Sequence, residues 1–376
     1  MINNKLLSVY SMLGCAALIA VLTSGQSAAQ NSTVVGSASA NLPWPNADKL
    51  RGEMKAAFTS GLKPVLELAK KSDPRNGWQL AVFYIGVSAA WQATGDKDYH
   101  HAIVEWGQSR NWQPEPRPRH ADDLACGQVY LELYAREGGP ERIAAIRKRV
   151  DAFLASPQPG HVDWWWCDAF FMAPPVFVEL SAATGDAHYR EAMHPLYWDA
   201  VAALWNEPNH LFYRDRRYLG TQVFWGRGNG WVLAGLARIL DGLPADDPAR
   251  PRYEALFKTM AARVVQLQGE DGAWRVNLLH PEKSPLPESS GTALFAYGLA
   301  WGVNHGLLSR GEYAPAVLKA WAALERAQLP DGQIGSVQAV GYEPRAAKPT
   351  DTAPYGAGAF LMLGSELLPP PPAPTG

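Results

Sequence analysis

The sequence around Asp168 combines an acidic side chain with aromatic residues, a combination that carbohydrate chemistry uses. Asp168 follows three consecutive tryptophans, Trp164 to Trp166, and precedes an apolar segment of helical character. Tryptophan rings can form platforms for sugars, and a carboxyl group beside such a platform can donate or accept a proton in glycan chemistry. Burial under aromatic rings would also raise the carboxyl pKa towards neutral pH. The stretch therefore predicts a carbohydrate-active site with Asp168 as its acid and with Trp164 and Trp166 as sugar contacts.

A second acidic position lies one structural repeat earlier. Asp123 precedes Asp168 by 45 residues, the length of an internal repeat, so the two carboxylates should face one cavity from neighbouring helices. Asp122 takes this role instead if the register differs by one residue. An Asp at a helix start commonly caps the helix, which is the competing interpretation for Asp122 and Asp123. A cap does not require three preceding tryptophans, so the sequence favours a functional role for Asp168.

A third cluster lies in residues 224–231, which contain three glycines. Arg227 stands between two of these glycines, which would allow a ligand to approach the backbone closely. Trp225 and Asn229 flank it, and all three are predicted to contact substrate. His120, in the loop before the Asp pair, is a further substrate-binding candidate. No metal role is expected for His120 because no second His lies at ligand spacing.

An internal repeat organises the chain. The tetrad Ala-Thr-Gly-Asp at residues 93–96 recurs at residues 183–186, and Gly138 marks a further helix end halfway between them. A glycine ends a helix because it adopts the left-handed conformation at little cost, and an Asp or Pro then begins the next helix. The repeat unit is therefore one helical hairpin.

Six hairpins of this kind are expected. Their second helices are apolar around most of the circumference and their first helices are amphipathic, so the second helices should lie inside. This pattern predicts an all-α fold, an (α/α)6 barrel in which the hairpins close into a double ring, with an open solenoid as the alternative. The predicted second helices span residues 78–93, 122–137, 168–183, 227–241, 290–306 and 351–367, and the first helices include residues 46–70, 140–155 and 250–268.

The loops that lead into the second helices are long, whereas the opposite connections are short. Long loops gathered at one end of a rigid scaffold are the usual place for function. They would open at the N-terminal ends of the inner helices, where free N–H groups favour an anionic ligand. These loops span residues 111–121, 157–167, 205–225, 270–288 and 330–350.

Composition adds limits on partners and location. The net charge of -2 over 376 residues gives no support for binding to nucleic acid or to an anionic membrane. Residues 1–29 have the positive start, apolar run and small-residue cleavage site of a secretory signal, which predicts export to a bacterial periplasm or beyond. The expected division is a signal peptide (1–29), a flexible segment (30–42), the catalytic domain (43–368) and a flexible proline-rich tail (369–376).

The mature chain would contain two cysteines, Cys126 and Cys167. Two cysteines form neither a disulfide scaffold nor a metal site by themselves. Two buried free thiols are favoured over a single disulfide.

The motifs resemble a known family. Residues 166–175, residues 224–231 and the shorter Ala-Asp-Asp at residues 121–123 resemble the six-hairpin glycosidases, and the likeness runs from about residue 46 to residue 367. It is strongest to the unsaturated rhamnogalacturonyl hydrolases of glycoside hydrolase family 105, which are related to the unsaturated glucuronyl hydrolases of family 88. The resemblance implies an (α/α)6 barrel and an oligosaccharide substrate with a 4,5-unsaturated uronic acid at its non-reducing end, as left by a polysaccharide lyase.

The resemblance also implies a mechanism. In this family the C4=C5 double bond is hydrated, and the anomeric carbon is not attacked directly. Asp168 matches the aspartate that protonates C4 and assists the water that attacks C5. Asp123 or Asp122 matches the second acidic residue of the family.

For binding, the resemblance places Arg227 near the sugar carboxylate with Trp225 beside it. It implies no metal and no organic cofactor. In some family members a histidine stands where this chain has Arg214. The resemblance therefore does not predict which sugar the subsite around Arg214 binds.

Two other functions are compatible with the same residues. An inverting glycosidase acting on a saturated glycan would use Asp168 as the acid and Asp123 as the base. An exported glycan-binding protein would use the same pocket without turnover.

Overall fold

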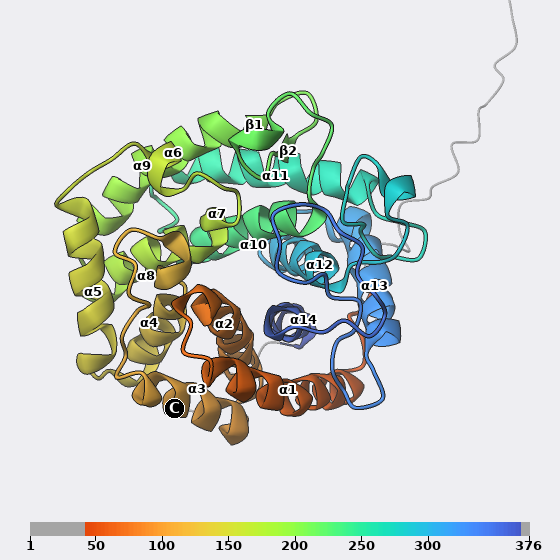
Figure 1. The fold of residues 1–376 in the computed structure, drawn as a ribbon, viewed down its shortest axis with the longest axis horizontal. Coiled ribbons are helices and arrows are strands. Elements are labelled where there is room, and N and C mark those ends of the chain that lie inside the picture. The colour runs from red at the N-terminus through yellow and green to blue at the C-terminus, as the bar shows by residue number, and fades with distance from the viewer. Residues whose placement is uncertain (1–41, 370–376) are drawn as a thin grey trace, which may run out of the picture. The chain divides into compact units, whose positions relative to one another are not determined.

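Residues 42–369 form two concentric rings of helices in the computed structural model, which describes this part of the chain (Figure 1). Each outer helix is followed in the chain by an inner helix of the same hairpin. The outer helices are α1 (Ala47–Ala69), α3 (Lys97–Ser109), α5 (Glu141–Leu154), α9 (His188–Leu204), α11 (Arg250–Gln266) and α13 (Arg310–Ala327). The inner helices are α2 (Gly77–Thr94), α4 (Cys126–Glu137), α8 (Pro174–Thr184), α10 (Gly226–Gly242), α12 (Ser289–Asn304) and α14 (Pro354–Leu367).

The inner ring is closed, because the last inner helix packs against the first. Helix α14 contacts α2 along much of its length. A Cβ atom added to Gly86 of α2 would lie 2.2 Å from the carbonyl oxygen of Gly358 in α14, so the two backbones touch where glycine leaves room. Ring closure confirms the predicted (α/α)6 barrel and excludes the open solenoid.

The helix ends follow the repeat found in the sequence. Gly95 ends α2 and Gly185 ends α8, both in the left-handed conformation, with φ of 68° and 71°. Asp96 then accepts a hydrogen bond from the amide of Asp98 at 2.8 Å and so caps α3. Asp186 likewise accepts a hydrogen bond from the amide of His188 at 2.9 Å, so these two short connections share one arrangement.

The predicted inner helices agree with the structure except near three of their starts. Helix α14 begins at Pro354, three residues after the predicted start at residue 351. A 3-10 turn, Ala121–Leu124, precedes α4 and replaces its expected first turn. The predicted helix 168–183 is divided at Ala173 into the short helix α7 (Ala169–Met172) and α8. Both interruptions lie at the end of the barrel where the long loops gather.

The connections that lead into the inner helices contain the remaining short elements. These are 3-10 turns at Pro74–Asn76, Arg216–Tyr218 and Pro281–Lys283, the short helix α6 (Gly160–Asp163), and the strands β1 (Trp205–Asn206) and β2 (Leu211–Phe212). The strands pair antiparallel, with Trp205 opposite Phe212.

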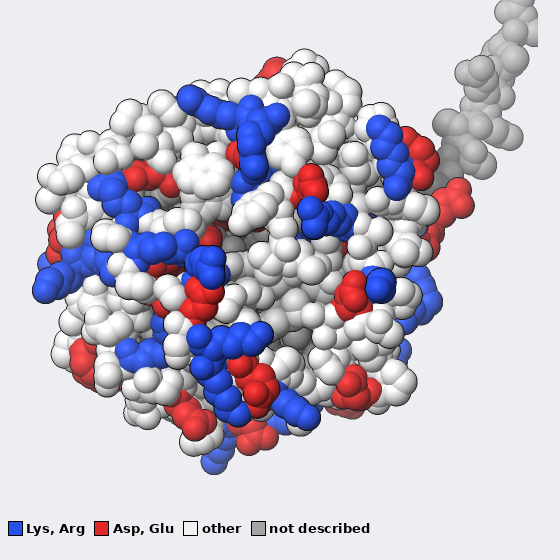
Figure 2. Space-filling view, viewed as in Figure 1, with Lys and Arg blue, Asp and Glu red and all other residues white. Residues whose placement is uncertain are grey.

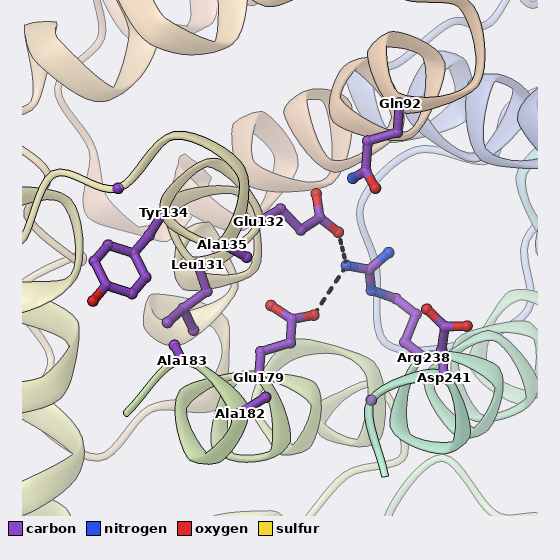
Figure 3. A pocket seen from close by; sticks show the side chains of 12 residues that line it. Gln92, Leu131, Glu132, Tyr134, Ala135, Glu179, Ala182, Ala183, Arg238 and Asp241 are labelled. Carbon is purple, nitrogen blue, oxygen red and sulfur yellow. Dashed lines mark hydrogen bonds and ion pairs between the residues drawn. The ribbon is translucent and has the colours of Figure 1, made fainter. Parts of the chain in front are cut away.

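The opposite end of the barrel holds a cavity of about 510 Å³ that is lined by the C-terminal parts of inner helices (Figure 3). Arg238 of α10 donates hydrogen bonds there to Glu132 of α4 at 2.5 Å and to Glu179 of α8 at 3.2 Å. Burial raises the pKa of Glu179 well above its usual value. Since Arg238 is itself buried and joins three neighbouring inner helices, we interpret this cluster as a structural clamp.

The two cysteines of the described part, Cys126 and Cys167, are buried and free, as predicted. Within residues 42–369 no helix is both long and apolar enough to cross a membrane. The predicted signal peptide (1–29), nearly all of the segment 30–42 and nearly all of the tail 369–376 lie outside the described residues and stay predictions.

Candidate active site

The loops before the inner helices enclose a cavity of about 500 Å³ at their end of the barrel. Lys and Arg side chains gather around the hollow on the face shown in Figure 2. The cavity is lined by aromatic rings, by guanidinium groups and by the carboxyl groups of three aspartates. Its lining includes Asp73, Arg75, Trp78, Arg117, His120, Asp122, Trp165, Trp166, Asp168, Arg214, Trp225, Arg227 and Tyr342.

Asp168 lies at the start of α7, and its side chain makes no capping hydrogen bond to the backbone. Its Oδ2 lies 3.6 Å from the Sγ of Cys167 and 4.0 Å from the Nε of Arg214. Burial raises the pKa of Asp168, while the charges of Arg214 and Arg227 oppose this rise. The carboxyl group therefore faces a ligand cavity in an environment that favours retention of a proton.

Of the two neighbouring aspartates, Asp122 lines the cavity and Asp123 does not. Burial, and then the charge of Asp168, raise the pKa of Asp122 to about 7. The Asp123 side chain is fully buried and accepts hydrogen bonds from the amide and guanidinium of Arg117. The expectation that Asp123 faces the cavity is corrected, because this ion pair turns its carboxylate away. Asp122, the alternative candidate for the second acidic residue, lines the cavity together with Asp168.

Arg227 is a buried cation without a carboxylate partner in the described part of the chain. It is 1% exposed, and its guanidinium donates to the carbonyl oxygens of Gln338 and Ala339. It also lies 4.7 Å from the ring centroid of Trp225 and 4.9 Å from that of Tyr355. No carboxylate of the described residues forms an ion pair with Arg227, although its charge acts on the nearby Asp168 and lowers the pKa of that carboxyl group. An anionic ligand in the cavity would therefore find an unpaired guanidinium there.

The other predicted binding residues at the cavity are Trp166, Trp225 and His120. The Trp225 indole donates to the side-chain oxygen of Gln338 at 2.8 Å, which fixes the ring at the cavity wall. The centroid of the His120 ring lies 4.8 Å from the ring centroid of Trp166. Burial, and then the charge of Arg117, lower the pKa of His120 to about 4, so its imidazole is neutral at neutral pH.

Two predicted substrate contacts lie outside the cavity. Trp164 is fully buried and packs against the rings of Phe153 and Phe177, so it belongs to the core. Asn229 is also fully buried, and its amide group exchanges hydrogen bonds with the backbone N–H and C=O of Phe212. Asn229 therefore holds the strand β2 in place, and neither side chain is available to a ligand.

Several cavity residues were not predicted as substrate contacts. Trp165, the middle tryptophan, is the exposed one of the three, at 42%. Arg117 and Tyr342 come from irregular loops, whose sequence carries no periodic signal for orientation. Arg214 departs from the family pattern, in which some members have a histidine, and this departure is the sequence signal that points to it.

Comparisons with known proteins place this geometry in a family. The family model described as Glycosyl Hydrolase Family 88 matches residues 47–369. The chain belongs to this family. It is therefore a glycoside hydrolase, and the similarity to six-hairpin glycosidases predicted from the sequence motifs is confirmed.

Relatives within this family are similar along most of their length. An unsaturated 3S-rhamnoglycuronyl hydrolase of Formosa agariphila is 41% identical over 316 residues, which cover 77% of this chain and 84% of the relative. A hydrolase of the same name from an Alteromonas species is 37% identical over 325 residues, which cover 79% of each chain. The solved structure of a family 88 glycosyl hydrolase from Bacteroides vulgatus is 30% identical, has a TM-score of 0.77, and covers 85% of this chain and 98% of that chain.

Proposed function

We propose that this glycoside hydrolase removes a terminal 4,5-unsaturated uronic acid from oligosaccharides by hydration of the C4=C5 double bond, with Asp168 as the general acid and base. The observation that carries the proposal is one cavity that holds two aspartates of raised pKa and the buried cation Arg227, which forms no ion pair with a described carboxylate. Their raised pKa values let this pair of aspartates hold a proton at higher pH than a free carboxyl group does, and Arg227 can bind the sugar carboxylate. The names of the relatives support an unsaturated rhamnoglycuronyl substrate.

In the proposed reaction, the proton of the Asp168 carboxyl group moves to C4 of the unsaturated sugar. A water molecule adds its oxygen to C5 and gives a proton back to Asp168, which returns to its starting state. The resulting hemiketal at C5 opens to a ketone, and the hemiacetal left at C1 then releases the aglycone as an alcohol. Each turnover consumes one water molecule and needs no other reactant.

Asp122 supports Asp168 in this scheme. Two carboxyl groups in one buried site resist the loss of both protons, so one of them stays protonated at a higher pH than either would alone. The carboxylate of the substrate would add a further negative charge and strengthen this effect. The pair is thus suited to proton donation at neutral pH, although a free carboxyl group is ionised there.

The inverting alternative lacks support from the geometry. It needs Asp123 as a base that activates water in the cavity, but Asp123 is fully buried and paired with Arg117. The alternative of a glycan-binding protein without turnover is not retained for a member of a hydrolase family.

The absorbance of the unsaturated bond tests the proposal. Purified protein is mixed with lyase-generated oligosaccharides, and the ultraviolet absorbance of the C4=C5 bond is followed together with the release of reducing ends. Loss of absorbance in step with release is expected. Stable absorbance with new reducing ends would instead indicate direct glycosidic hydrolysis, and neither change would remove the proposed activity.

We also propose that the protein is exported, on the sequence of residues 1–29 alone. The test is expression of the chain with and without these residues in a Gram-negative host, followed by fractionation. Recovery in the periplasm or medium only when residues 1–29 are present is expected. Equal recovery of both forms in the cytoplasm would contradict export.

A further inference from the structure

The side chain of Gln338 connects two parts of the active site without lining the cavity itself. Gln338 lies in the connection between α13 and α14, is 2% exposed, and is not among the cavity residues. Its Oε1 accepts a hydrogen bond from the indole of Trp225 at 2.8 Å, and its Nε2 donates to the carbonyl of Glu343 at 2.8 Å. One amide group thus joins the cavity wall at Trp225 to residues 339–343, the loop that follows Gln338.

The backbone at Gln338 also holds the buried cation of the site. Its carbonyl oxygen accepts hydrogen bonds from the guanidinium of Arg227 and from the hydroxyl of Tyr355, and the carbonyl of Ala339 accepts from Arg227 at 3.1 Å. The Nε of Arg227 is buried and has no hydrogen-bond partner among the described residues. The two carbonyls therefore fix the orientation of the guanidinium and leave its Nε without a partner in the protein.

Glu288 fixes the position of the Gln338 backbone. The Glu288 side chain caps α12, because it accepts hydrogen bonds from the amides of Ser290 at 3.1 Å and of Gly291 at 2.7 Å. The same carboxylate accepts a hydrogen bond from the amide of Gln338 at 3.1 Å. Gln338 is therefore attached to an inner helix of the barrel, and its position is preorganised before a ligand binds.

The loop that Gln338 closes forms part of the cavity mouth. Residues 340–342 line the cavity, and they lie between Gln338 and Glu343, which the amide joins. The carbonyl of Tyr342 accepts a hydrogen bond from the hydroxyl of Tyr218 at 2.9 Å, which gives the loop a second point of attachment. A loop closed at its base in this way has fewer conformations than a free one, so the Tyr342 ring is kept at the mouth.

We propose that Gln338 is a positioning residue of the active site, which sets Trp225 against the terminal sugar and holds residues 340–342 in place for the sugar that follows. Arg227 depends on the same arrangement, because Ala339 belongs to the closed loop. The competing explanation is a structural hydrogen-bond network, whose loss would lower stability and leave the KM of the folded enzyme unchanged. The proposal rests on the proposed function, because it takes Trp225 and Arg227 to contact the substrate.

Gln338→Met tests the proposal, because methionine has a similar length and makes neither side-chain hydrogen bond. KM and kcat are measured on the methyl glycoside of a 4,5-unsaturated uronic acid and on a lyase-generated unsaturated disaccharide. The buried indole N–H of Trp225 loses its acceptor, which should raise KM about tenfold on the methyl glycoside. On the disaccharide KM should rise further, by about thirtyfold, because the second sugar also meets the released loop. We expect kcat to change by less than about threefold, since Gln338 makes no contact with Asp168.

Gln328→Met is the matched structural control. Gln328 lies at the end of α13, and its amide donates to the carbonyls of Glu53 and Gly332 at 3.2 and 3.0 Å. It does not line the cavity, so the variant should lower the melting temperature and leave KM on both substrates at the wild-type value. The same behaviour in Gln338→Met, with lower stability and unchanged KM, would overturn the proposal.

Double variants show through which partners Gln338 acts. Trp225→Phe keeps an aromatic ring but removes the N–H that Gln338 accepts, and Tyr342→Ala removes the ring at the mouth. Combined with Gln338→Met, each should raise KM by less than the product of the single effects, Trp225→Phe on both substrates and Tyr342→Ala on the disaccharide. Multiplicative effects in either pair would contradict the proposed role.

A second variant keeps the test decisive if Gln338→Met does not fold. Gln338→Asn retains the amide but withdraws it by one methylene group, and it is measured in the same way. Unchanged KM in the variant that folds would exclude a positioning role. Failure of the proposed function has a different signature, because the wild-type enzyme would then remove the double-bond absorbance of neither substrate.

Discussion

Asp122 and Asp168 line one cavity from consecutive helical hairpins, and burial raises the pKa of both carboxyl groups. The negative charge of Asp168 contributes to the raised pKa of Asp122. The pair therefore combines the two effects that keep a carboxyl group protonated near neutral pH, which are desolvation and a neighbouring like charge.

Replacing the proposed proton donor should abolish turnover without unfolding the protein. Asp168→Asn keeps the side-chain volume but cannot donate a carboxyl proton, so we expect kcat to fall by about three orders of magnitude or more. Steady-state kinetics on lyase-generated oligosaccharides measures the loss, and the melting temperature shows whether the fold persists. Retention of most of the activity would remove Asp168 from the mechanism.

The pH dependence should report the titration of the pair. A raised pKa means that the donor form is populated at low pH and is lost as the pH rises through the apparent pKa, so kcat/KM should decline on the alkaline side. In Asp122→Asn the two carboxyl groups no longer share one site, so the higher of the pair's two apparent pKa values is lost and this decline should shift to lower pH. A shift to higher pH in the variant would contradict the proposed coupling.

Adjacent aspartates should give opposite phenotypes. Asp122→Asn should reduce activity with little change in stability, because Asp122 faces the cavity. Asp123→Asn breaks a buried pair with Arg117 and should lower the free energy of unfolding by about 2 kcal/mol while kcat stays close to the wild-type value. Urea unfolding and kinetics on both variants make the comparison, and the reverse assignment of the two effects would show that Asp123 is the catalytic neighbour.

Adjacent tryptophans should also differ. Trp164→Ala removes a fully buried ring and should destabilise the protein by about 3–5 kcal/mol. Trp165→Ala removes an exposed ring at the cavity mouth and should raise KM with little effect on the melting temperature. Thermal unfolding with kinetics on both variants is the check, and an unchanged KM in Trp165→Ala would exclude this ring from substrate binding.

The sequence was sufficient to predict the barrel. The recurrence of Ala-Thr-Gly-Asp located the hairpins, because glycine ends the helices and Asp96 caps the next one. The apolar character of the second helices then placed them inside. These signals are local and periodic, so they can be recognised in a single sequence without an alignment.

The predictions failed where the orientation of one side chain depends on irregular backbone. The 3-10 turn at Ala121–Leu124 changes the register by one residue, so that Asp122 and not Asp123 faces the cavity. Among three consecutive tryptophans, composition could not distinguish the buried Trp164 from the exposed Trp165. Tyr342 lies in the long loop 330–350, where only the tertiary structure determines which residues reach the cavity.

The most direct test of the central claim is the position of solvent hydrogen in the product. The reaction is run in D₂O with a lyase-generated unsaturated oligosaccharide, and the released sugar is analysed by NMR and mass spectrometry. If Asp168 protonates C4 during hydration, the wild-type product carries deuterium at C4 and no double bond, and Asp168→Asn forms none of it in the same time. A released uronic acid that keeps its C4=C5 bond and carries no deuterium at C4 would contradict the account.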